Sequence, residues 1–178
     1  MLLEIINKVL ATGAIISQIF IVLALIYILL PYKQQKISEF FSGNGIKLAF
    51  VCACLATAGS LFYSNYAGFE PCPLCWFQRI FMYPQVILLG LALFKKDKNI
   101  IDYSLALSII GVVISIYHNY IVINGLHSTV CTISEPCTIN YVLEFGYITI
   151  PAMALTAFLL IILLLMSQKT WQKKISVN

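Results

Sequence analysis

The fold is decided by residues 46–94, IKLAFVCACLATAGSLFYSNYAGFEPCPLCWFQRIFMYPQVILLGLALF. This stretch contains two apolar runs, residues 46–67 and 77–94, each close to the roughly 20 residues that a membrane-spanning helix needs. Between them lies a short piece with two prolines and two cysteines, EPCPLC at residues 70–75. Prolines at this point break the apolar pattern, so the stretch predicts two antiparallel spans joined by a short cysteine-bearing loop.

The composition of the whole chain supports the same conclusion. Hydrophobic residues make up 61% of the 178 residues and charged residues only 10%, with a mean hydropathy of +0.93. These values lie far outside the range of soluble globular domains, so the chain is predicted to be an integral membrane protein. A chain of this length has room for four or five spans and little else, which argues against a separate soluble domain.

Five apolar runs are candidates for spanning helices, and each is bounded by residues that interrupt helices. The fold class is therefore an all-α membrane protein with short loops. The predicted spans are residues 9–30, 46–67, 77–94, 104–123 and 147–166. The predicted breaks are Pro31, the Gly43-Asn44-Gly45 turn, Pro71, Pro73, the lysine-rich cluster at residues 95–98 and Pro136.

The positions of the lysines predict the orientation, because Lys and Arg accumulate in short loops on the cytoplasmic side. Nine lysines fall in alternate loops or the tail: residues 33, 36, 47, 95, 96, 98, 169, 173 and 174. Only Lys8 and Arg79 fall on the other side, which also carries Glu70, Glu135 and Glu144. The net charge of +4 is thus explained by topology and gives no reason to expect a nucleic-acid partner.

The first run could also be a signal peptide. It is too long for the apolar core of one, Lys8 is not followed by further basic residues, and no small-residue cleavage pattern precedes Pro31. A spanning helix with an external N-terminus is the better interpretation.

With this topology, two pairs of cysteines face outward. Cys72 and Cys75 lie in the loop after the second span, and Cys131 and Cys137 lie in the loop after the fourth. Outside the cytosol such pairs can persist as disulfides. The C-x-x-C spacing at the start of a helix brings two sulfurs within disulfide reach, with a proline tolerated in the first turn.

A positively charged residue near this motif can change the reactivity of its cysteines. Arg79, the one arginine of the chain, lies four residues after Cys75 and therefore on the same helical face. The helix N-terminus and this guanidinium favour a thiolate at Cys75, which would make the sulfur a nucleophile or a good leaving group.

Other interpretations of the cysteines stay open at this point. A thiolate site for zinc or iron is possible in principle, although five residues separate the cysteines of the second pair and external thiols are exposed to oxidation. Both pairs could also be inert structural crosslinks, but such a crosslink does not need the nearby Arg79. Cys52 and Cys54 lie within an apolar span, where cysteine is usually a small packing residue.

Two stretches resemble a known family. CPLCWFQRIFMYP at residues 72–84 and FGYITIPAMALTAF at residues 145–158 are similar to the disulfide bond formation protein B family, the membrane quinone reductases called DsbB, in their short bacillus-type form. The resemblance covers about residues 46–166 and implies a four-helix transmembrane bundle core. It leaves residues 1–45 as an additional N-terminal transmembrane helix with a cytoplasmic loop, and residues 167–178 as a cytoplasmic tail.

The resemblance implies a role for each cysteine. Cys72 and Cys75 match the pair next to the quinone, with Cys75 as the sulfur that attacks it. Cys131 matches the cysteine that exchanges with a thioredoxin-fold oxidase of DsbA type, and Cys137 the one that passes the bond to Cys72. Such exchange proceeds by thiolate attack through mixed disulfides.

The same resemblance implies the acceptor. Arg79 matches an arginine that assists the quinone reaction, and His118 matches in placement a histidine near the quinone. The implied electron acceptor is ubiquinone or menaquinone, and no metal is expected. The implied location is the bacterial cytoplasmic membrane, with several spans and both cysteine loops extracytoplasmic.

Two other functional classes remain as alternatives. One is an oxidoreductase of the vitamin K epoxide reductase type, in which the C-x-x-C follows the loop pair in sequence, whereas here it comes first. The other is a non-enzymatic membrane scaffold or chaperone whose loops are merely crosslinked.

Overall fold

The structure, a computed structural model, describes residues 2–29, 35–95, 97, 99–126, 130–131 and 137–177. Helix α1 (Leu2–Leu29) is followed by α2 (Gln35–Leu61), which continues as a π-helical turn η1 (Phe62–Tyr66). Helices α3 (Pro73–Lys95), α4 (Ile100–Asn124) and α5 (Ile150–Val177) complete the chain. In the described part, five helices are long and apolar enough to cross a membrane, which confirms the predicted all-α membrane class.

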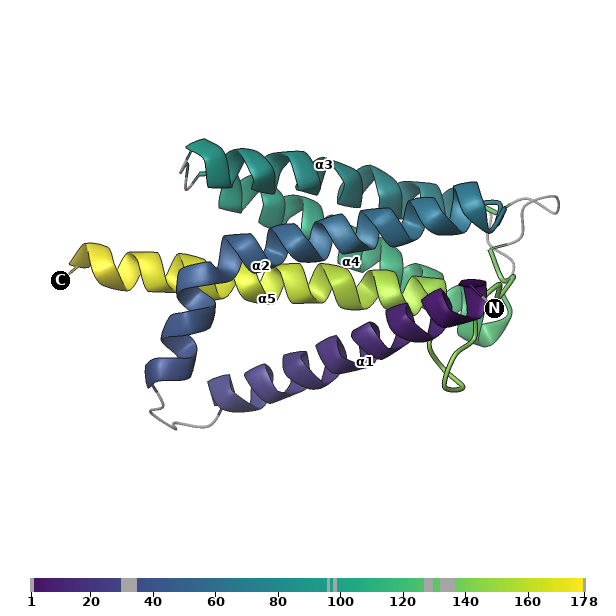
Figure 1. Cartoon of the computed structure of the whole chain (residues 1–178), viewed down its shortest axis with the longest axis horizontal. Coiled ribbons are helices and arrows are strands. Elements are labelled where there is room, and N and C mark those ends of the chain that lie inside the picture. Colours follow the sequence, from purple (N-terminus) through teal and green to yellow (C-terminus); the bar gives the residue numbers. More distant parts are fainter. Residues whose placement is uncertain are drawn as a thin grey trace.

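Helices α2 to α5 form a four-helix bundle in which each helix packs against two neighbours. Successive helices run in opposite directions, as the short connections predicted (Figure 1). The largest buried cluster draws on all four helices and lies along the bundle axis: Ala49, Ala53, Met82, Leu89, Ile101, Phe158, Ile161, Leu164 and Leu165.

Polar and small residues join the helices of the bundle. Gln85 on α3 is fully buried and donates a hydrogen bond of 2.7 Å to the hydroxyl of Ser108 on α4, while Ser104 donates to the Gln85 side-chain oxygen. Two turns closer to the cysteines, Gln78 donates to Ser115 over 3.1 Å. Inside a lipid bilayer there is no hydrophobic force that drives helices together. Interhelical hydrogen bonds and close packing therefore determine which helix faces meet.

Helix α1 lies outside this bundle and packs against α5 (Figure 1). Its Gln18 donates a hydrogen bond of 3.0 Å to Thr156 on α5 and accepts one of 3.0 Å from the Tyr147 hydroxyl. Ala11 and Ala14 are buried at the same face. Two polar contacts on one side chain therefore fix α1 at one rotation about its axis.

The predicted spans are close to the observed helices but differ at their ends. Helix α1 begins at Leu2 rather than at residue 9, and α3 begins at Pro73 rather than at residue 77. Helix α5 begins at Ile150 and extends to Val177, so the predicted tail, residues 167–178, is mostly a continuation of this helix. Predicted features at residues 31, 33, 96, 98, 135 and 136 lie outside the described residues.

The predicted turn at Gly43-Asn44-Gly45 is wrong, because α2 runs through it. Gly45 is instead a point of close approach between helices. Its backbone N–H donates a hydrogen bond of 2.8 Å to the side chain of Gln168 on α5. A Cβ at this position would stand 2.9 Å from Cβ of Gln168, closer than such atoms approach. Glycine here allows α2 and α5 to touch, and it does not end the helix.

The C-x-x-C cysteines lie at one end of the bundle, and Lys95 and Lys169 lie at the other. Cys72 immediately precedes the start of α3, whereas Lys95 ends the same helix. At that second end Lys169 of α5 forms an ion pair of 2.5 Å with Asp102 in the first turn of α4. The described lysines thus follow the asymmetry that the sequence indicated.

Candidate active site

The C-x-x-C motif forms the N-terminal turn of α3, as its sequence predicted. Cys72 precedes the helix, Pro73 is its first residue, and the backbone N–H of Cys75 donates to Sγ of Cys72 over 3.4 Å. This is the contact of a helix N-cap, with sulfur in place of the usual oxygen. The two Sγ atoms lie 2.9 Å apart, so formation of the Cys72–Cys75 disulfide needs only a small movement.

His118 of α4 lies between the two cysteine pairs. Its Nε2 is 3.7 Å from Sγ of Cys72 and 3.3 Å from the backbone carbonyl oxygen of Cys137. The side chain is almost fully buried, and its Nδ1 has no hydrogen-bond partner among the described residues. The sequence associated His118 with the quinone, and the structure places it against Cys72.

These contacts favour a negative charge on Cys72 when the motif is reduced. The pKa of Cys72 is lowered to about 4, chiefly because the Cys75 thiol donates a hydrogen bond to the Cys72 sulfur. The hydrogen bond and charge of His118 contribute to this lowering, and burial opposes it. The sequence indicated the thiolate at Cys75. The structure favours Cys72 because that residue occupies the N-cap, where the donors converge.

The second pair meets the first. Cys131 and Cys137 are joined by a disulfide with a Cα–Cα distance of 5.8 Å. Cys137 is buried in one cluster with Cys72, and Cys75 and Cys131 pack against that cluster. All four loop cysteines therefore gather at one end of the bundle, which the sequence suggested by topology alone.

Stacked aromatic rings hold the two loops together. The ring of Phe69, just before the C-x-x-C motif, stacks on Tyr141 of the second loop with centroids 4.6 Å apart. Phe69 also stacks on Tyr63, with ring centroids 5.8 Å apart. Sequence reasoning missed this stack, and the only available signal was the presence of aromatic residues in both loops. The stack limits how far the second pair can move from Cys72.

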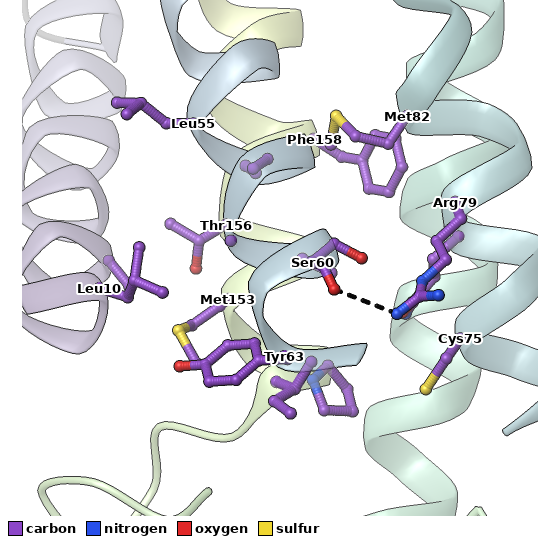
Figure 2. A pocket seen from close by; sticks show the side chains of 18 of the residues that line it. Leu10, Leu55, Ser60, Tyr63, Cys75, Arg79, Met82, Met153, Thr156 and Phe158 are labelled. Atoms are coloured by element: carbon purple, nitrogen blue, oxygen red, sulfur yellow. Dashed lines mark hydrogen bonds between the residues drawn. The ribbon is translucent and has the colours of Figure 1, made fainter. Parts of the chain in front are cut away.

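Arg79 lies one turn after Cys75 on α3. Its Nη2 donates a hydrogen bond of 3.2 Å to the carbonyl oxygen of Ser60, in the last turn of α2, as Figure 2 shows. Its guanidinium carbon lies 5.2 Å from the ring centroid of Trp76. The side chain is only partly buried, and it lines the same cavity as Cys75. The four-residue spacing therefore does place both groups at one site.

This cavity has a volume of about 630 Å³, within the roughly 300–1,000 Å³ that is typical of small-molecule sites. It extends from Cys72, Cys75, Arg79 and His118 past Tyr63 to α1 (Figure 2). Most of its lining is apolar. The hydroxyl of Tyr63 is buried in its wall and has no hydrogen-bond partner in the described chain.

The geometry of the C-x-x-C motif and His118 does not fit a tetrahedral zinc ion. The ligand atoms of Cys72, Cys75 and His118 lie within 4.8 Å of one another. However, two sulfurs on a tetrahedral zinc ion stand about 3.8 Å apart, since each Zn–S bond is about 2.3 Å long. The observed separation of 2.9 Å is shorter and suits sulfur–sulfur chemistry better.

The structure combines a bundle of helices that can span a membrane with two cysteine pairs that meet at one end of it. This combination is typical of membrane proteins that exchange thiols and disulfides. The sequence profile described as "Disulfide bond formation protein DsbB" matches residues 44–168, and the chain belongs to this family. This membership gives it a role in disulfide bond formation. The matched residues comprise most of α2, all of α3 and α4, and most of α5, but not α1.

Curated relatives agree. The chain is 48% identical over 109 residues to "Probable disulfide formation protein C 1" of Bacillus cereus, which covers 60% of this chain and 78% of that protein. It is 45% identical over 124 residues to "Probable disulfide formation protein" of Oceanobacillus iheyensis, covering 68% and 86%. It is 44% identical over 120 residues to "Disulfide bond formation protein C" of Bacillus subtilis, covering 65% and 85%. No solved structure matched the chain significantly.

Proposed function

We propose that this protein is a membrane thiol:quinone oxidoreductase. It reoxidises an extracytoplasmic thioredoxin-fold oxidase of DsbA type and passes the electrons to a membrane quinone. The observation that carries this proposal is the burial of Cys72 and Cys137 in one cluster beside a largely apolar cavity that also contains Arg79. Electrons can thus pass from the loop pair to the C-x-x-C pair and leave at a site suited to a lipid-soluble acceptor.

The exchange begins at the loop pair. A thiolate of the partner attacks Cys131, forms a mixed disulfide and releases Cys137 as a thiolate. Cys137 then attacks Cys72 in the oxidised Cys72–Cys75 pair, and the sulfur of Cys75 leaves with two electrons. The second thiol of the partner resolves the mixed disulfide and frees Cys131. Attack of Cys131 on Cys137 restores the loop disulfide and releases Cys72, whose charge is stabilised by its N-cap position and by His118.

The electrons then reach the quinone. Cys75 lies in the cavity wall, so its thiolate can react with a quinone ring bound there. Negative charge develops on the quinone oxygens, and the guanidinium of Arg79 can stabilise it in a site with little competing water. If the Cys75 sulfur bonds to a quinone ring held there, attack of Cys72 on that sulfur would re-form the Cys72–Cys75 disulfide, break the bond between sulfur and ring, and leave the electron pair on the ring. Two electrons and two protons leave in the hydroquinone, which balances the oxidation of one partner dithiol.

The proposed location is the bacterial cytoplasmic membrane, with both cysteine loops on the extracytoplasmic side. Support comes from the lysines, since Lys47, Lys95 and Lys169 lie toward the end of the bundle opposite the cysteines. Disulfides at the cysteine end would then be kept away from the reducing cytosol.

A trapping experiment tests the exchange with the partner. In Cys137→Ser the thiol of Cys131 is first converted to a mixed disulfide with a small aromatic thiol by treatment with a dipyridyl disulfide. The partner thiolate can then attack the Cys131 sulfur and displace the small thiol, and Cys137, the sulfur that would reverse the adduct, is absent. With a DsbA-type partner that lacks its own resolving cysteine, we expect a mixed disulfide through Cys131 on non-reducing gels. Cys131→Ser serves as the matched control and should form no comparable product. An adduct only in Cys131→Ser would reverse the two roles, and no adduct in either variant would support inert crosslinks.

A further inference from the structure

The cavity at the cysteines is not confined to the family-matched helices. One face of α1 also lines it, through Leu10, Gly13, Ser17 and Phe20. These residues follow one another by three, four and three positions, so they form a single stripe along the helix. The stripe lies to one side of the face that packs on α5, where Ala11 is buried and Gln18 is hydrogen-bonded to Thr156.

The contacts of α1 leave space beside α2. Among the described residues α1 packs mainly against α5 and makes few contacts with α2. Leu10 and Leu55 point from α1 and α2 toward the space between the two helices (Figure 2). A Cβ added at Gly59 would meet the Leu10 side chain at 3.3 Å, whereas one added at Gly13 would meet no atom within 4 Å. The cavity is therefore narrow at Leu10 and open at Gly13.

The chemistry changes along the cavity. Near α3 it offers the Cys75 sulfur and the guanidinium of Arg79. Toward α1 the wall becomes largely aliphatic, apart from Ser17 and Thr156. Their hydroxyls already donate hydrogen bonds to the carbonyls of Gly13 at 2.8 Å and Ala152 at 2.9 Å. A molecule with a polar ring at one end and a hydrocarbon chain at the other fits this sequence of surfaces.

We propose that α1 forms the wall that holds the isoprenoid tail of the quinone, while the ring lies beside Cys75. This inference rests on the proposed quinone reduction and assigns a role to a helix that lies outside the family match. A tail that moves from lipid to this wall gains little hydrophobic free energy, because both surroundings are apolar. The wall therefore acts through close packing and by limiting the directions that the tail can take.

The first test fills the cavity at α1. Gly13→Phe adds a ring where a Cβ has open space, and Ile19→Phe adds the same ring at an exposed position that does not line the cavity. Each variant and the parent protein receive a naphthoquinone and a dimethoxybenzoquinone, each with and without a tail of four isoprene units. We expect kcat/KM for the tailed quinones to fall about tenfold in Gly13→Phe, the order of effect of one well-packed apolar group in a pocket. For the tail-less quinones, kcat/KM of Gly13→Phe should stay within about twofold of the parent value. For all four quinones, kcat/KM of Ile19→Phe should also stay within about twofold of the parent value.

The second test does not depend on turnover or on the stability of a variant. The parent protein, in which α1 is intact, is irradiated with a quinone that carries a diazirine in its first isoprene units. Peptide mass spectrometry should place the label within residues 10–20, on the side of Leu10, Gly13 and Ser17. Excess unlabelled quinone with the same tail should remove it.

The outcomes separate the two proposals. If the parent protein reduces none of the four quinones, the proposed function fails. If it reduces them, but Gly13→Phe affects tailed and tail-less forms alike and the label lies outside the stripe on α1, the function stands and the role of α1 is wrong. Label on the outward side at Ile19 would likewise overturn the tail site.

Discussion

Replacement of Arg79 by methionine should slow electron transfer to quinone and leave exchange with the partner intact. The side chain makes one hydrogen bond of 3.2 Å to the Ser60 carbonyl and a cation–π contact of 5.2 Å with Trp76. Loss of these contacts should lower the free energy of unfolding by only about 1–2 kcal/mol. Loss of one preorganised group that stabilises developing negative charge should slow the chemical step by about tenfold to a thousandfold, or about 1.4–4 kcal/mol.

The assay measures both half-reactions on the same purified variants. Reduction of a soluble quinone analogue is followed by absorbance, and reduction of the loop disulfide by the partner is followed by rapid acid quench and thiol alkylation. Arg79→Lys is the matched control: it keeps the charge but not the planar fork, so its rate should lie between those of the parent and Arg79→Met. Equal quinone kinetics in parent and Arg79→Met would refute the reasoning and reduce Arg79 to a helix anchor at Ser60.

Three further predictions concern topology, ionisation and packing. After reduction, a membrane-impermeant thiol reagent added from outside should label the loop cysteines and miss Cys52 within α2. Labelling of the loop cysteines only from the cytoplasmic side would contradict the extracytoplasmic placement of these loops. Alkylation of Cys72 should slow by less than twofold from about pH 8 to about pH 6, against about 75-fold for an ordinary thiol, because its thiolate persists until the pH falls through the lowered pKa. A profile extended to about pH 3 should have its midpoint at higher pH in His118→Ala. An unchanged midpoint would show that His118 does not contribute, and a slowing of about 75-fold in the parent on the same scale would contradict the lowered pKa. Gly111→Ala should lower the free energy of unfolding by about 1–3 kcal/mol, because the added Cβ meets the buried ring of Phe158; a thermal stability equal to that of the parent would show that α4 and α5 pack less closely.

Features that depend on average polarity could be predicted from the sequence. The five apolar runs correspond to the five helices because a lipid environment requires long uninterrupted helices, whatever the details of their packing. The C-x-x-C turn at the start of α3 was also predictable, since Pro73 fixes the backbone at a position where no N–H is needed.

Features that depend on contacts between distant residues could not be predicted in the same way. A glycine pair usually signals a turn, but Gly45 is needed for the approach of α5, and that neighbour is 123 residues away in sequence. The placement of His118 against Cys72 depends on how α4 is rotated relative to α3. That rotation is set by buried pairs such as Gln85 with Ser108, which no periodic pattern reveals.

Continuous turnover tests the central claim most directly. Purified protein is supplied with a reduced DsbA-type partner in excess and a soluble quinone analogue, and both partner thiols and quinone absorbance are followed. The account predicts one quinone reduced for each partner dithiol oxidised, over many turnovers, with loss of this coupling in Cys75→Ser. A protein that oxidises the partner once and never reduces quinone, or a Cys75→Ser variant that turns over like the parent, would contradict it.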